Sequence, residues 1–270
     1  MKSLGQHFLS DYGVVSRILA AVDTAPGQAV IEVGPGLGVL TERLIEQAER
    51  LIAVEIDVKL AQRLREQLKD KANLVIVERD VLKAPPETLL AEAGLESEAP
   101  YVVVGNLPYN AGAAIVRHFL EALHPPRSIV AMLQREVADS IVGGPGKMGL
   151  LGVSVQVYAR PKKLFNVPPR AFYPPPKVTS SVIRLDVLDQ PLILSEQREG
   201  FFRVVRAGFS APRKQLRNTL AQGLGISGAE AESRIRSAGL EPTLRPQDVP
   251  LEGWLRLAGA GSPSESANDA

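Results

Sequence analysis

The sequence has no cysteine and only three histidines, and these absences exclude several classes of protein. Without cysteine the chain has no disulfide, no thiolate metal ligand and no cysteine nucleophile. The histidines, His7, His118 and His124, are too scattered to indicate a zinc enzyme, and we expect no bound metal. Long apolar runs are also missing. The longest stretch free of charged residues, Ala99 to Val116, contains two prolines and two asparagines and is no membrane span. The opening residues lack the apolar core of a signal peptide, so we expect a cytoplasmic protein.

What is present describes a globular chain with an uneven charge distribution. Of the 270 residues, 45% are apolar and 23% are charged, which is ordinary for a folded protein of one large domain with an appendage. The net charge is +1, but residues 160–217 hold twelve basic and four acidic side chains. A concentrated positive block on an otherwise acidic chain indicates a polyanionic partner, although charges that pair within the protein give the same pattern.

The first 135 residues alternate apolar, β-branched runs with helix-like stretches. The runs predicted as strands are Ala29–Val33, Leu51–Glu55, Leu74–Val77, Tyr101–Gly105 and Ile129–Leu133. The stretches predicted as helices include Val39–Gln47, Val58–Lys69 and Ala111–Leu123. Continuous apolar strands separated by helices are typical of a parallel sheet covered on both faces, so the sequence predicts an α/β fold.

The alternation stops after the fifth predicted strand. Two apolar runs, Gly149–Tyr158 and Val178–Val187, are joined by a basic, proline-rich connection and predict an antiparallel hairpin at the sheet edge. From about Glu196 the pattern is helical, with a break at Gly223–Gly228 and a last short helix at Leu251–Leu257. We therefore expect a sheet domain over residues 1–190, a small all-α domain over 196–258 and a disordered tail over 259–270.

Three features at the ends of predicted strands indicate a nucleoside site. A glycine-rich turn with Gly34 and Gly36 follows the first strand, but its G-x-G-x-G spacing differs from the dinucleotide fingerprint. Glu55 ends the second strand, where a carboxylate can accept both ribose hydroxyls; a solvated strand end is the plainer alternative. Asp80 follows the third strand and can accept a hydrogen bond from an adenine amine. With no G-x-x-x-x-G-K-[ST] motif, the pattern favours a nucleoside without phosphates, such as S-adenosylmethionine.

The segment Asn106-Leu107-Pro108-Tyr109 ends the fourth predicted strand. Pro108 cannot continue a ladder, which leaves the Asn106 amide and the Leu107 carbonyl at the strand tip. Two such acceptors can draw an exocyclic amine toward tetrahedral geometry while Tyr109 stacks on its base. A proline-terminated strand with a capping Asn and a buried Tyr is the alternative.

At these residues the chain resembles the KsgA (RsmA) family of ribosomal RNA adenine dimethyltransferases, over roughly residues 2–258. The matching segments are KSLGQHFL (2–9), EVGPGLGVLT (32–41), VEID (54–57), RDVL (79–82), GNLPYN (105–110), QREVA (134–138), VPPRAFYPPPKVTSSVIRL (167–185) and FSAPRKQLRN (209–218). The chain departs from the family's pattern at Ala211-Pro212, where a polar or basic pair is usual.

The resemblance implies a Rossmann-like S-adenosylmethionine-dependent methyltransferase domain, a mostly parallel sheet with an antiparallel edge hairpin, followed by a small helical domain that docks on the ribosome. It implies dimethylation of two adjacent adenosines in the 3′-terminal hairpin loop of small-subunit (16S) rRNA, and the small subunit as partner of a monomeric enzyme.

The implied cofactor residues are His7, Leu9, Gly34, Gly36, Glu55, Ile56, Asp80, Val81 and Asn106. The residues expected at the target adenine are Asn106, Leu107, Pro108, Tyr109 and Phe172, with Phe172 stacking on its opposite face. The residues expected at RNA phosphates are Arg203, Arg206, Arg213, Lys214 and Arg217.

Three other functions remain open at this point. A resistance-type methyltransferase of large-subunit rRNA shares the catalytic half, but the QREVA and PPPKV segments favour the small-subunit enzyme. A non-catalytic assembly factor is disfavoured by the intact Glu55, Asp80 and Asn106. A nicotinamide oxidoreductase is disfavoured by the glycine spacing.

Overall fold

The computed structural model describes residues 7–259 of the chain, which divides into two compact units. The first unit contains residues 1–138 and 160–187, and the second contains residues 139–159 and 188–270. Apart from Gly259, the predicted disordered tail lies outside the described residues. None of the helices within residues 7–259 combines the length and the apolar character needed to cross a membrane.

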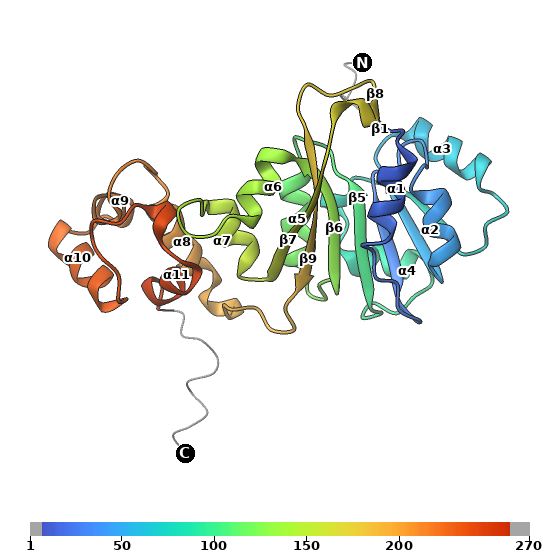
Figure 1. Cartoon of the computed structure of the whole chain (residues 1–270). Helices are drawn as coiled ribbons and strands as arrows, with labels where there is room; N and C mark the ends of the chain where they lie inside the picture. The colour runs from blue at the N-terminus through green and yellow to red at the C-terminus, as the bar shows by residue number, and fades with distance from the viewer. Residues whose placement is uncertain (1–6, 260–270) are drawn as a thin grey trace. The chain divides into compact units, whose positions relative to one another are not determined.

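The first unit is built on a seven-stranded sheet with the strand order β4-β3-β2-β5-β6-β9-β7 (Figure 1). Its strands are β2 (Ala29–Val33), β3 (Arg50–Glu55), β4 (Leu74–Glu78), β5 (Tyr101–Asn106), β6 (Ser128–Gln134), β7 (Ala159–Val167) and β9 (Ser180–Val187). The neighbours from β4 to β6 are parallel, whereas β9 runs antiparallel to β6. A separate antiparallel pair is formed by β1 (Phe8–Leu9) and β8 (Phe172–Tyr173).

The central strands are buried along almost their whole length, which confirms the predicted α/β arrangement. Every residue of β2 is buried, as are the first five of β5 and the first six of β6. Because alternate side chains of a strand face opposite sides, continuous burial means that both faces of the sheet are covered. The helices of this unit are α1 (Tyr12–Leu19), α2 (Thr41–Gln47), α3 (Val58–Gln67), α4 (Pro86–Glu92) and α5 (Gly112–Leu120).

The strand order reverses between β2 and β5, and this reversal positions the site. The chain runs outward from β2 through β3 to β4, and β5 then returns to the other side of β2. At such a switch point the loops leave the carboxyl ends of neighbouring strands in opposite directions, which opens a crevice for a ligand.

The predicted edge hairpin is wrong in its first strand. Residues 149–158 form not a strand but the helix α7 (Leu150–Gln156), in which four consecutive residues are buried. A short apolar run surrounded by packing on all sides has no periodicity that separates a buried strand from a buried helix. The edge strand is instead β7, in the segment interpreted as a basic connection. Its proline and lysines suit an edge, where one side of the backbone needs no ladder partner and charge opposes aggregation.

The second unit is helical. Its elements after α7 are α8 (Arg198–Gly208), α9 (Leu216–Leu224), α10 (Gly228–Ser237) and α11 (Leu251–Leu257), while α6 (Arg135–Val142) begins in the first unit and ends in the second. Residues 139–159, expected in the sheet domain, belong to this unit because α7 packs against α8. Trp254 is fully buried and its ring stacks on Phe209 at 5.1 Å. The break predicted at Gly223–Gly228 is confirmed, since α9 ends at Leu224 and is capped by Gly225, which has φ +69°.

Candidate active site

A cavity of about 490 Å³ lies where the loops after β2, β3, β4 and β5 meet. Its size is that of a typical small-molecule site. The predicted cofactor residues all line it, and so do four of the five residues expected at the target base, Asn106 belonging to both sets. These lining residues are His7, Leu9, Gly34, Gly36, Glu55, Ile56, Asp80, Val81, Asn106, Leu107, Pro108 and Tyr109.

The glycine-rich turn after β2 forms the floor of this cavity. Gly34 and Gly36 have φ values of +70° and +59°, a region that residues with a Cβ rarely adopt. A Cβ added to Gly36 would lie 3.2 Å from the Phe8 ring. The absence of a side chain at Gly36 therefore also allows Phe8 of β1 to pack closely against the turn. The backbone of the turn is thereby open to a ligand lying against it.

Two carboxylates extend the site along β3 and β4. Glu55 is 3% exposed, and its two oxygens accept hydrogen bonds from Gly36 N at 3.1 Å and Asp57 N at 3.0 Å. Asp80 accepts a hydrogen bond from Leu82 N at 3.1 Å and so caps the short 3₁₀ helix Val81–Lys83. Between them in the cavity wall lies the apolar side chain of Ile56, a residue that is 57% exposed. Carboxylates beside an exposed apolar surface suit a ribose and an aromatic base.

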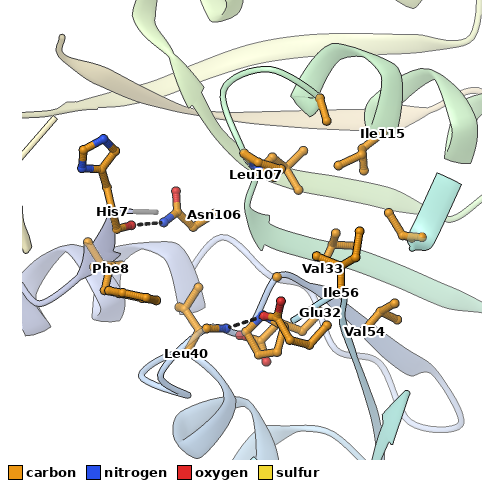
Figure 2. Close-up of a pocket in the computed structure, with 18 of the residues that line it drawn as sticks. His7, Phe8, Glu32, Val33, Leu40, Val54, Ile56, Asn106, Leu107 and Ile115 are labelled. Atoms are coloured by element: carbon orange, nitrogen blue, oxygen red, sulfur yellow. Dashed lines mark hydrogen bonds between the residues drawn. The ribbon is translucent and has the colours of Figure 1, made fainter. Parts of the chain in front are cut away.

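The opposite wall is held together by the N-terminal segment. Asn106 Nδ2 donates to the His7 carbonyl at 3.2 Å, the bond drawn between these residues in Figure 2. The His7 ring in turn donates from Nδ1 to the Pro174 carbonyl at 2.7 Å. Since the amide nitrogen of Asn106 is engaged, its Oδ1 is the atom left to accept a hydrogen bond from a ligand.

The aromatic residues of the site differ in their placement. Tyr109 is partly exposed and lines the cavity, where its ring lies 6.0 Å from that of His7. Phe172 does not line the cavity: it is 3% exposed and pairs with Leu9 across the β1–β8 ladder, within the apolar core. A core position offers no free ring face, so this conformation does not display the predicted stacking of Phe172 on the target base.

Sequence reasoning assigned no role to Glu32, which the structure places in the cavity wall. This residue of β2 is 1% exposed, and its Oε2 has no hydrogen-bond partner among residues 7–259, nor does the nearby buried Thr41 hydroxyl. Burial raises the pKa of the Glu32 carboxyl from 4.5 to about 8, and the charge of Glu55 adds to this rise. The sequence feature that could have identified Glu32 is an acidic residue inside an otherwise apolar predicted strand.

The basic residues predicted to contact RNA all lie in the helical unit. Arg203 and Arg206 are exposed and three residues apart on α8, so they share a face, and Arg213 and Lys214 are exposed in the following loop. Arg217 differs, because it forms an ion pair of 3.2 Å with Glu232. Hydrogen bonds from Arg236 and Arg217 hold the pKa of Glu232 below its ordinary value.

The sheet order and a ligand site at its switch point define the class, a Rossmann-like methyltransferase. The structure resembles the crystal structure of the 23S rRNA methyltransferase ErmE, with a TM-score of 0.73, 29% identity and coverage of 94% of this chain and 98% of ErmE. It resembles a dimethyladenosine transferase from Plasmodium falciparum in fold, with a TM-score of 0.77, 19% identity and coverage of 93% and 96%.

The sequence comparisons are more specific. The model of the ribosomal RNA adenine dimethylase family matches residues 1–256, and the chain belongs to this family. Proteins named ribosomal RNA small subunit methyltransferase A are similar to it over 95% of the chain. That of Dehalococcoides mccartyi is 44% identical and is covered to 86%, and that of Syntrophotalea carbinolica is 42% identical and is covered to 95%.

Proposed function

We propose that this chain transfers methyl groups from S-adenosylmethionine to the N6 amines of two adjacent adenosines in the 3′-terminal hairpin loop of small-subunit rRNA. The observation that carries the proposal is the meeting of the nucleoside-type turn and the Asn106–Tyr109 segment at one cavity. Membership of the adenine dimethylase family and the names of the similar proteins support this substrate over large-subunit rRNA. We expect the enzyme to act as a monomer in the cytoplasm.

The cavity residues fit S-adenosylmethionine. Glu55 would hold the ribose hydroxyls, Asp80 and Val81 the adenine, and the turn at Gly34 and Gly36 the methionine end. The unpartnered Glu32 Oε2 supplies a second test of fit, since a buried polar atom in the wall of a ligand site is satisfied by a polar group of the ligand. When bound, the cofactor supplies an electrophilic methyl group on a sulfonium.

Asn106 and Leu107 would prepare the amine. The lone pair of an adenine N6 is delocalised into the ring, and two acceptors for its hydrogens favour the tetrahedral form in which that pair is available. Asn106 Oδ1 is one acceptor, and the Leu107 carbonyl is the other; the bond from Leu107 N to Met132 O at 3.1 Å fixes the backbone just before this carbonyl. These two acceptors would hold the amine with its lone pair toward the methyl group that the cofactor supplies, and the proton that N6 loses would pass to solvent.

The helical unit would hold the rRNA by its phosphates. Arg203, Arg206, Arg213 and Lys214 are exposed, and contacts of this kind position the RNA without reading its sequence. The target adenosine must leave its stack to reach the cavity, at a cost of a few kcal/mol in a duplex and less in a loop. A hairpin loop is therefore the substrate in which moving the target base out of its stack costs the least free energy.

The test is transfer of labelled methyl groups to unmethylated small subunits, with large subunits and an Asn106→Ala variant alongside. We expect dimethyladenosine in small-subunit rRNA only, and none with the variant, which should still bind the cofactor because its side chain acts at the amine. Label in large-subunit rRNA would indicate a resistance-type enzyme. Tight binding of small subunits without label would indicate an assembly factor.

A further inference from the structure

The phenol of Tyr109 is bound to a buried serine from a distant part of the chain. Tyr109 Oη lies 2.7 Å from Ser180 Oγ, a normal length for a hydrogen bond between hydroxyls. Ser180 is the first residue of β9 and is fully buried. The antiparallel ladder that pairs Ser180 with Gln134 of β6 brings it beside Tyr109, although the two residues are 71 positions apart in the sequence.

This bond fixes the one part of Tyr109 that the backbone leaves free. The main chain at Tyr109 is set by a tight turn in which Gly112 N donates to the Pro108 carbonyl at 2.8 Å. The ring itself can still rotate about two side-chain bonds. With its tip held by Ser180, the ring has a defined direction at the cavity wall, and the tilted His7 ring lies 6.0 Å from it.

We infer that Ser180 is a positioning residue for methyl transfer, which through Tyr109 Oη holds the ring in the place where the target adenine stacks. The inference rests on the proposed function. A base stacked on a ring of fixed orientation presents its N6 amine at a fixed place relative to Asn106 Oδ1. A ring free to turn presents it over a range of places, and reaction rates fall steeply with such misplacement.

The experiment compares Ser180→Ala with Ser181→Ala. Ser181 is the matched control: it is equally buried, and its hydroxyl donates to Asn166 Oδ1 at 2.8 Å instead of contacting Tyr109. With saturating S-adenosylmethionine, Ser180→Ala should lower kcat for small-subunit methylation about tenfold, the rate equivalent of one good hydrogen bond. The KM for small subunits should change little, because phosphate contacts supply most of the affinity for RNA. Ser181→Ala should keep the kcat of the unmodified protein.

Tyr109→Phe removes the same hydrogen bond without altering the buried strand, so it tests the inference even if Ser180→Ala folds poorly. It should lower kcat by a similar factor, and the double variant should lose no more than either single variant, because both changes remove one interaction. Calorimetric titration should give the same affinity for S-adenosylmethionine in all variants.

Several outcomes overturn the inference. An unchanged kcat in Ser180→Ala and Tyr109→Phe would show that the bond has no part in the reaction. An equal loss in Ser181→Ala would assign the effect to the packing of β9. Multiplying losses in the double variant would mean that the two hydroxyls act separately. Failure of the unmodified protein to methylate either subunit would instead refute the proposed function, and the inference with it.

Discussion

Replacing Glu32 by Gln should change how the stability of the sheet unit depends on pH. The side chain is fully buried in β2, and this burial raises the pKa of its carboxyl from 4.5 to about 8. Gln has nearly the same shape but no charge at any pH. The substitution therefore removes the ionisation and leaves the packing of the strand almost unchanged.

The direction in which stability changes with pH follows from whether the folded or the unfolded chain holds the Glu32 proton. Between pH 4.5 and 8 the carboxyl is ionised in the unfolded chain and protonated in the folded one, so unfolding releases a proton. The free energy of unfolding then falls by about 1.4 kcal/mol per pH unit across this window. The stability linked to Glu32 is fully present below pH 4.5 and is lost by about pH 8, a total of about 5 kcal/mol.

The measurement is urea unfolding of both proteins at several pH values between 5 and 8.5. Circular dichroism follows the whole chain, while fluorescence of Trp254, the single tryptophan, follows the helical unit and serves as an internal control. The difference in free energy of unfolding between Glu32→Gln and the unmodified protein should grow with pH for the sheet unit. For the helical unit this difference should stay constant with pH. An advantage that does not vary with pH would refute the assignment of a neutral, buried Glu32.

Three further variants, two single and one double, test other predicted roles. Glu55→Ala removes a buried acceptor and should weaken S-adenosylmethionine binding by about 10- to 100-fold in calorimetry, the value of a hydrogen bond to a charged group; an unchanged Kd would exclude a role at the ribose. Phe172→Leu keeps apolar volume in the core and should leave kcat within about twofold, whereas a large loss would indicate that the ring does stack on the base in the reacting complex. Removing Arg203 and Arg206 together should lower the slope of log affinity for small subunits against log salt concentration by about 1.4 to 1.8, and an unchanged slope would place the phosphate contacts elsewhere.

Most of the sheet could be predicted from the sequence because its strands are buried on both faces. Runs such as Tyr101–Gly105 are apolar throughout and lie between turn residues, so the predicted limits differ from those of β5 by one residue. The site residues could be placed for a related reason. In a parallel sheet the residues that end or closely follow each strand lie at the same edge, and this rule alone brings Gly34, Glu55, Asp80 and Asn106 together.

The errors occur where tertiary packing decides the local structure. Residues 150–156 are apolar and rich in valine, which favours a strand, but α7 packs against α8 and is a helix. Residues 159–167 contain proline and charges, which disfavour a central strand but suit the sheet edge. The bond between Tyr109 and Ser180 depends on the pairing of β6 with β9, which no local pattern of either residue reveals.

The acidic groups of the cavity lead to a last prediction, about which nucleosides it accepts. Glu55 and Asp80 line it, the lining within residues 7–259 includes no lysine, and its Arg79 forms an ion pair of 2.8 Å with Glu92. A phosphate brought here would meet carboxylates without a free cation, whereas a sulfonium would be attracted. S-adenosylmethionine should therefore raise the Tm, and NAD at the same concentration should not. An equal rise with NAD would mean that the pyrophosphate finds a site away from these carboxylates, and the acidic groups would then not explain the choice of cofactor.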